Sequence, residues 1–262
     1  MLEHFHLLFG AGYDAWAWSY EEASSPKRRE RMHDYLQEAA ERIAAGGAAP
    51  VTPRLRTALL SADALAELAH DRNLVVMARR PLRLADPLAL GSPFERLLKF
   101  GSSPLIAVRG YRWLYSRRRM PAPKHILVVL DGTADAECSL PAATAIAEAT
   151  GATISLFRTV AAMPYYGIPC LEKEGEAQDY LDGVAASLRE RRVPVESVVW
   201  TSDEAMGEVI LSSAQRLNAD LIAMTASLRR TLAGRMRRKP VQYLVRRSAT
   251  PVLIVNGDRA RS

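Results

Sequence analysis

The sequence contains two copies of one pattern, and this internal repeat restricts the possible folds more than any other feature. The copies are NLVVMARRPLRLADPLALGSPFERLLKFGSSPLIAVRG, residues 73–110, and ADLIAMTASLRRTLAGRMRRKPVQYLVRRSATPVLIVN, residues 219–256. Met77 and Met224 are 147 positions apart, as are Pro104 and Pro251, and the copies align between these anchors without a gap. An offset that stays constant over strand, loop, helix and strand indicates two copies of one α/β unit.

Two short apolar runs in the second copy predict buried strands. The runs are LIAM at 221–224 and VLIV at 252–255; both are bounded by polar or turn residues and neither alternates. Such runs are typical of parallel strands that are covered on both faces of a sheet. We expect a short helix between them with Pro240 in its first turn, where the missing N–H of proline costs no hydrogen bond.

Strands and helices alternate along the rest of the chain. Strands are predicted near 4–9, 54–60, 125–131, 153–160 and 195–200, and helices near 25–46, 62–70, 134–150, 172–192 and 204–217. This alternation predicts an α/β protein with two tandem, doubly wound parallel-sheet domains. The first domain would span residues 1–110 and the second residues 124–262, with a short basic linker at 111–123.

Composition excludes several classes of protein. Of the 262 residues, 48% are apolar, which is enough for a sizeable core, but no apolar run reaches transmembrane length. We therefore expect no membrane partner. Two cysteines, Cys138 and Cys170, do not make a disulfide framework, and this favours a cytoplasmic location.

No catalytic constellation or metal site stands out in the sequence. The five histidines have no ligand spacing with Cys or acidic residues, and there is no P-loop, nucleophile elbow or clustered carboxylate pair. Cys138 lies in a predicted helix without an adjacent base, and we expect it to be buried. Asp131 is a candidate general base, but we favour an aspartate that caps the turn after a strand or that binds a ribose. We expect neither enzymatic activity nor a bound cofactor.

The second half resembles the universal stress protein family. The resemblance lies in ILVVLDG at 126–132, ADLIAMT at 219–225 and RRSATPVLIV at 246–255, and the first half is similar more faintly through LVVMA and GSPFERLLKF-GSSPLIAV. It implies a five-stranded parallel sheet of order 3-2-1-4-5 in each half. Tandem members of the family resemble an intramolecular dimer whose last strands meet about a pseudo-twofold axis. We therefore expect residues 104–108 to pair with residues 251–255, and a homo-oligomer is a further possibility.

By this resemblance, the first half lacks one strand–helix unit. The second half has a strand and a helix at 125–150 before its strand at 153, whereas the first half begins with the equivalent of that later strand. The family's strand 1 is central, so its loss leaves two inner edges unpaired. Three outcomes are possible. Strands 2 and 4 could pair directly, a segment of the linker or of another chain could fill the gap, or Met1 could be a late start of a longer protein. We favour closing up or a late start.

Some family members bind ATP through an aspartate that ends strand 1 and the pattern G-x2-G-x9-G-[ST] after strand 4. Glycines let the backbone approach the phosphates, and the final Gly-Ser opens a helix whose N–H groups attract anions. The second half keeps the aspartate as Asp131, but its pattern positions hold Thr225, Leu228, Arg238 and Lys239. The corresponding residues of the first half are Ala78, Pro81, Gly91 and Ser92. Ser92 is also explained as the cap of a helix.

The leading interpretation is a non-enzymatic stress-response protein that acts as a binding or regulatory module and has lost the ATP motif. The alternative is an adenine-nucleotide binder. Its candidate contacts, carried over from the resemblance, are Asp131, Gly132, Thr133, Val160, Gly91 and Ser92.

A basic segment, Arg229–Lys239, is the candidate contact for an anion or for an unidentified protein partner. Its charged residues are Arg229, Arg230, Arg235, Arg237, Arg238 and Lys239. The last three crowd the amino end of the predicted helix, where positive charge is unfavourable unless an anion offsets it. A solvated loop is the simpler explanation. Association with nucleic acid through the arginine clusters is a weaker alternative, and its affinity would fall steeply with salt.

Overall fold

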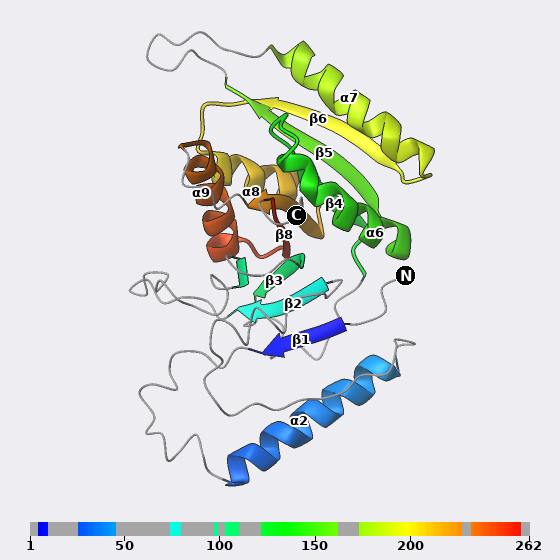
Figure 1. The fold of residues 1–262 in the computed structure, drawn as a ribbon, viewed down its shortest axis with the longest axis vertical. Coiled ribbons are helices and arrows are strands. Elements are labelled where there is room, and N and C mark those ends of the chain that lie inside the picture. Colours follow the sequence, from blue (N-terminus) through cyan, green and yellow to red (C-terminus); the bar gives the residue numbers. More distant parts are fainter. Residues whose placement is uncertain are drawn as a thin grey trace.

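The computed structural model describes residues 5–9, 26–45, 74–79, 97–98, 103–109, 122–161, 173–226 and 232–257. Within these ranges the chain forms one eight-stranded sheet, which runs in Figure 1 from β6 near the top to β1 near the bottom. The strands are β1 (Phe5–Phe9), β2 (Leu74–Arg79), β3 (Leu105–Arg109), β4 (His125–Val129), β5 (Thr153–Val160), β6 (Val195–Thr201), β7 (Leu221–Ala226) and β8 (Val252–Asn256). Every pairing is parallel except the one between β3 and β8. The predicted α/β class with a mostly parallel sheet is therefore confirmed.

The second half supplies five neighbouring strands of this sheet. Across the sheet they occur as β6, β5, β4, β7 and β8, so that, counted from β4 as the first, the order is 3-2-1-4-5. All residues of β7 and β8 are buried, which confirms the prediction of strands covered on both faces. Alternate side chains enter two separate cores: Ile222 and Ile254 belong to one, and Ala223 and Leu253 to the other.

Helices cover the two faces of the second half. The core that contains Leu253 is closed by α6 (Leu140–Thr150) and α7 (Glu174–Glu190), and the core that contains Ile254 by α8 (Met206–Arg216) and α9 (Leu232–Arg247). A short 3-10 helix, η2 (Ala136–Ser139), precedes α6. The remaining described helix, α2 (Pro26–Ala44), belongs to the first half. None of the described helices is long and apolar enough to cross a membrane.

The two halves join through antiparallel strands. Leu105, Ile106 and Ala107 of β3 lie opposite Ile254, Leu253 and Val252 of β8. This is the pairing expected from the repeat, and it makes the sheet continuous across the halves. Leu97 and Leu98, also of the first half, are buried in the same core as the second-half residues Val241 and Leu244.

The strands of the first half have closed up. β1 pairs directly with β2 in parallel, with Phe5 opposite Leu74 and Phe9 opposite Ala78. A linker strand or a strand from another chain between them is therefore excluded. The strand predicted near 54–60 and the helix predicted near 62–70 lie outside the described residues.

The predicted start of α9 is wrong. The helix begins at Leu232, and Pro240 lies inside it instead of in its first turn. The segment before the proline, LAGRMRRK, consists mostly of residues with high helix propensity, so the helix extends upstream although Pro240 cannot donate a hydrogen bond to the preceding turn. Val241 and Leu244, which follow the proline, are buried in the core and hold the helix against the sheet.

A buried hydrogen bond ties the end of β8 to the first half. Asn256 is 4% exposed, and its side-chain Nδ2 donates to the backbone oxygen of Leu98 over 2.8 Å. Replacing Asn256 by Ala leaves a buried carbonyl without this donor. We expect Asn256→Ala to lower the free energy of unfolding by about 1–3 kcal/mol, measured by urea titration.

A suitable control is Gln178→Ala on α7, because Gln178 donates to Asp182 in a solvent-exposed pair. This variant is expected to change stability by less than about 0.5 kcal/mol. If both variants lose the same free energy of unfolding, the hydrogen bond from Asn256 to Leu98 contributes no more stability than an exposed one.

Candidate functional site

The loop after β4 carries Asp131, the first residue of the candidate site. Its Oδ1 accepts two hydrogen bonds from Thr133, one from the backbone N–H at 3.1 Å and one from the hydroxyl at 2.6 Å. The Thr133 hydroxyl in turn accepts the N–H of Ala136 at 3.3 Å. This is the turn-capping role that an aspartate takes at the start of a loop.

Gly132 brings the loop close to a buried arginine. Its φ of +78° lies in the left-handed region, which favours glycine. A Cβ atom at this position would be 2.6 Å from Cζ of Arg158. Arg158 comes from β5 and is only 9% exposed, and its guanidinium group lies against the backbone of Gly132, which is itself exposed.

Two further side chains complete this group. The guanidinium of Arg158 lies over the ring of Tyr180, with Cζ 4.9 Å from the ring centroid, and the Tyr180 hydroxyl donates to Oε1 of Glu137 over 2.8 Å. Burial, the bond to Glu137 and the charges of Glu137 and Asp131 raise the pKa of the Tyr180 phenol, whereas the charge of Arg158 opposes the rise. Tyr180 is therefore neutral and acts as a donor. We call Asp131, Gly132, Glu137, Arg158 and Tyr180 the strand-end cluster.

Sequence reasoning had missed Arg158, Glu137 and Tyr180. One signal was present: Arg158 is a charged residue within TISLFRTV, a strand whose other residues are apolar or small and polar. A charge is rarely buried unless it is paired, so its position inside a buried strand marked it as unusual. Nothing in the sequence indicated its neighbours.

Two other predicted positions also have internal partners. The carbonyl oxygen of Val160 accepts the N–H of Ser202 at 3.0 Å. Thr225, which occupies the first glycine position of the ATP pattern, donates from its hydroxyl to the carbonyl oxygen of Ala136 over 3.0 Å. Both Thr225 and Ala136 are 6% exposed, and the Thr225 methyl packs against Gly257. The side chain therefore fills the space between β7, η2 and the end of β8.

The basic segment is only partly described. Outside the described residues lie its first two charged residues, Arg229 and Arg230, and also Leu228. The same holds for the first-half candidates Gly91 and Ser92. The other four charged residues of the segment belong to α9, in which Arg235 is the fourth residue and Arg237, Arg238 and Lys239 are the sixth to eighth. The prediction that the last three crowd the amino end of a helix is therefore wrong, because the helix begins five residues earlier than they do. The argument from the helix dipole does not apply to them.

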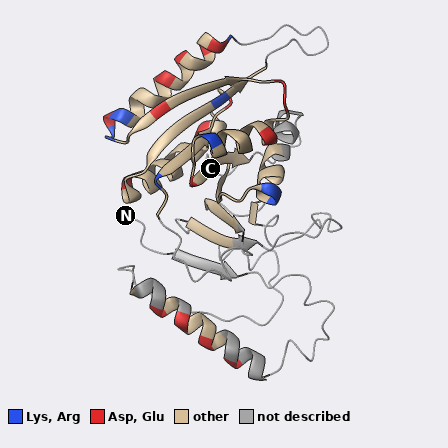
Figure 2. Cartoon of the chain, turned by 180° about the vertical axis from the view of Figure 1, so that it is seen from behind, with Lys and Arg blue, Asp and Glu red and all other residues tan. Residues whose placement is uncertain are grey.

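Acidic groups mark the exposed sides of other helices. Figure 2 shows Asp and Glu along α2 and α7, and these include Glu30, Asp34, Glu174, Asp179 and Glu190, which are all exposed. The α7 sequence has five acidic residues and one basic residue, Arg189, so this helix repels anions.

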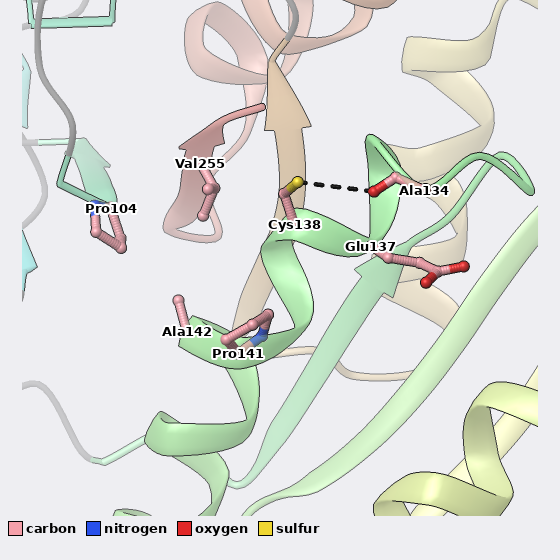
Figure 3. Close-up of a pocket in the computed structure, with 7 residues that line it drawn as sticks. All are labelled: Pro104, Ala134, Glu137, Cys138, Pro141, Ala142 and Val255. Carbon is pink, nitrogen blue, oxygen red and sulfur yellow. Dashed lines mark hydrogen bonds between the residues drawn. The ribbon is translucent and has the colours of Figure 1, made fainter. Parts of the chain in front are cut away.

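An open hollow of about 420 Å³ lies beside η2, where the two halves meet (Figure 3). Its lining residues are Pro104, Ala134, Glu137, Cys138, Pro141, Ala142 and Val255. Cys138 is half-buried, not buried as predicted, because η2 places it next to this hollow; its thiol lies 3.6 Å from the Ala134 carbonyl oxygen. In Figure 3 the carboxylate of Glu137 points away from Cys138. The described residues contain no group of three or more His, Cys, Asp or Glu side chains that would hold a metal ion.

The contact between Gly132 and Arg158 is testable by a double-mutant cycle. Gly132→Ala costs about 1–2 kcal/mol for its left-handed backbone, and the new methyl also displaces the Arg158 guanidinium. In an Arg158→Ala background only the backbone cost remains. We therefore expect Gly132→Ala to be less destabilising there than in the wild-type protein, as measured by urea unfolding of all four proteins.

Gly183→Ala on α7 serves as the control, because a Cβ at Gly183 meets no atom within 4 Å. This substitution is expected to stabilise the helix or leave it unchanged in both backgrounds. If Gly132→Ala had the same effect with and without Arg158, the guanidinium would not be pressed against this loop.

Comparison with known proteins now places the chain in a family. A model of the universal stress protein family matches residues 123–256, which is just over half of the 262 residues. No curated protein sequence matches the chain.

Several solved structures resemble the chain. A universal stress protein from Archaeoglobus fulgidus DSM 4304 has a TM-score of 0.61 at 16% identity, with 88% of this chain and 77% of that chain covered. A protein from Pseudomonas aeruginosa UCBPP-PA14, described as a universal stress protein, has a TM-score of 0.55 at 16% identity, with 98% and 94% covered. A universal stress protein from A. fulgidus in complex with dAMP reaches a TM-score of only 0.39 at 17% identity, with 50% and 96% covered.

The two better matches show that the fold extends beyond the second half, and the family model covers the loop after β4 together with β7, α9 and β8. The chain belongs to the universal stress protein family.

Proposed function

We propose that this chain is a non-enzymatic universal stress protein that works as a binding or regulatory module and does not bind ATP in the manner of its nucleotide-binding relatives. It would consist of two tandem copies of one α/β unit, 1–110 and 124–262, of which the first lacks strand 1. A cytoplasmic location, a protein partner at the basic segment and homo-oligomers stay predictions from the sequence.

The observation that carries the proposal is the hydrogen bond between Thr225 and Ala136. β4 pairs with β5 on one side and with β7 on the other, and ligands of such sheets bind in the crevice between the strand ends at this point. The Thr225 hydroxyl ties the end of β7 to η2, which follows β4, across this crevice. A glycine at this position would leave the crevice open, whereas the threonine side chain occupies it.

The remaining polar groups support the same conclusion. Asp131 accepts hydrogen bonds from Thr133, the Val160 carbonyl accepts one from Ser202, and Gly132 is covered by Arg158. A nucleotide would have to displace these internal contacts. Breaking these hydrogen bonds lowers the affinity for a nucleotide, because the ligand must replace them.

The tandem arrangement is supported by three independent features. The sequence repeats with an offset of 147 residues, β3 and β8 pair in antiparallel fashion as the last strands of the two copies, and the structural likeness to the A. fulgidus protein covers 88% of this chain. Because β1 pairs directly with β2, the first copy would need no strand 1 between them.

The proposal predicts that nucleotides do not stabilise the protein. A ligand at a hundredfold excess over its Kd would raise the free energy of unfolding by about 2.7 kcal/mol. We expect no such rise with ATP, AMP or cAMP at millimolar concentration, measured by thermal unfolding, and no nucleotide in the mass spectrum of freshly purified protein.

The matched control is Asp131→Ala, which removes the carboxylate that the nucleotide-binding alternative needs. A small rise in the unfolding temperature that persists in Asp131→Ala would come from unspecific nucleotide binding. A saturable rise in the wild-type protein that is lost in Asp131→Ala would refute the proposal and establish the adenine-nucleotide alternative.

A further inference from the structure

Arg158 is a buried charge in an unusual place. It lies near the carboxyl end of β5, yet it is only 9% exposed. A buried charge is costly unless the surrounding groups compensate for it. The environment of Arg158 must therefore be built to accept a cation.

The walls around Arg158 match a guanidinium group in shape. Gly132 presents a backbone surface without a side chain, and the Tyr180 ring lies 4.9 Å from Cζ. A planar guanidinium stacks on an aromatic ring and fits against a flat wall better than a tetrahedral ammonium does. The left-handed backbone of Gly132 keeps that wall free of a Cβ atom.

The charges around Arg158 match it as well. Glu137 binds the hydroxyl of Tyr180, and both Glu137 and Asp131 are close enough to that phenol to raise its pKa, while Arg158 lowers it. The charges of Glu137, Asp131 and Arg158 thus all act on one phenol, and Glu137 also accepts its hydroxyl. Removing Arg158 would take away the only cation of the strand-end cluster and leave its two carboxylates.

We propose that the strand-end cluster is a binding pocket for a planar cation of the alkylguanidinium class, and that the chain fills this pocket with its own Arg158. The side chain takes the place of a ligand at the carboxyl ends of β4 and β5. The inference does not depend on the proposed function, because it concerns what the pocket accepts and not whether a nucleotide binds the wild-type protein.

The proposal predicts chemical rescue. Arg158→Ala removes the guanidinium and leaves a space beside Gly132 and Tyr180, so the variant is expected to unfold at a lower temperature than the wild-type protein. Ethylguanidinium at millimolar concentration is expected to raise the unfolding temperature of Arg158→Ala along a saturation curve. Ethylammonium, which carries the same charge without the planar group, is expected to have little effect.

The control variant is Arg216→Ala. Arg216 also lies over an aromatic ring, with Cζ 4.8 Å from the centroid of Trp200, but it is exposed and its removal leaves no enclosed space. Neither the wild-type protein nor Arg216→Ala is expected to respond to ethylguanidinium. An equal response in all three proteins, or none in Arg158→Ala, would overturn the proposal.

A second variant keeps the test decisive if Arg158→Ala does not fold. Arg158→Lys keeps the positive charge but loses the planar fork, and it is expected to unfold at a lower temperature than the wild-type protein. An unchanged unfolding temperature would show that the pocket requires only a charge, and the proposal would be wrong. Rescue of Arg158→Ala by AMP but not by ethylguanidinium would likewise reject a planar-cation pocket and indicate a nucleotide site behind Arg158.

Discussion

The antiparallel pairing of β3 and β8 is the interaction on which the rest of the architecture depends. Each of these strands would otherwise be the edge of a smaller sheet, with a row of backbone groups open to solvent or to another chain. By pairing with each other they produce a single eight-stranded sheet. The same junction joins Leu97 and Leu98 of the first half to the core beneath α8 and α9. The two halves thus share one core across this junction.

The strand pairing differs between the two halves at the site of the candidate cluster. In the second half, β4 lies between β5 and β7, and the loop that follows it carries Asp131 and Gly132. In the first half, β1 and β2 are directly paired, and no described strand lies between them. The described part of the chain therefore retains one crevice of the kind in which parallel sheets bind ligands.

That crevice is occupied by the protein itself. On the side toward β7, Thr225 donates to the Ala136 carbonyl, and on the side toward β5, Arg158 covers Gly132. Thr225 and Ala136 are buried and bonded to each other, whereas Asp131 and Gly132 are exposed. The buried side of the crevice is stable because its polar groups have partners.

The sequence by itself predicted the repeat and the described strands, and the family resemblance predicted the junction of the halves. Residues 153–160 were predicted as a strand and form β5, because a short apolar run of this kind specifies its own burial. Pro240 was misplaced, because helix propensity upstream of the proline outweighed its preference for a first turn. Only the tertiary structure decided the strand-end cluster. Asp131, Arg158 and Tyr180 are far apart in the sequence and meet only where β4, β5 and α7 pack together, and no local pattern encodes that contact.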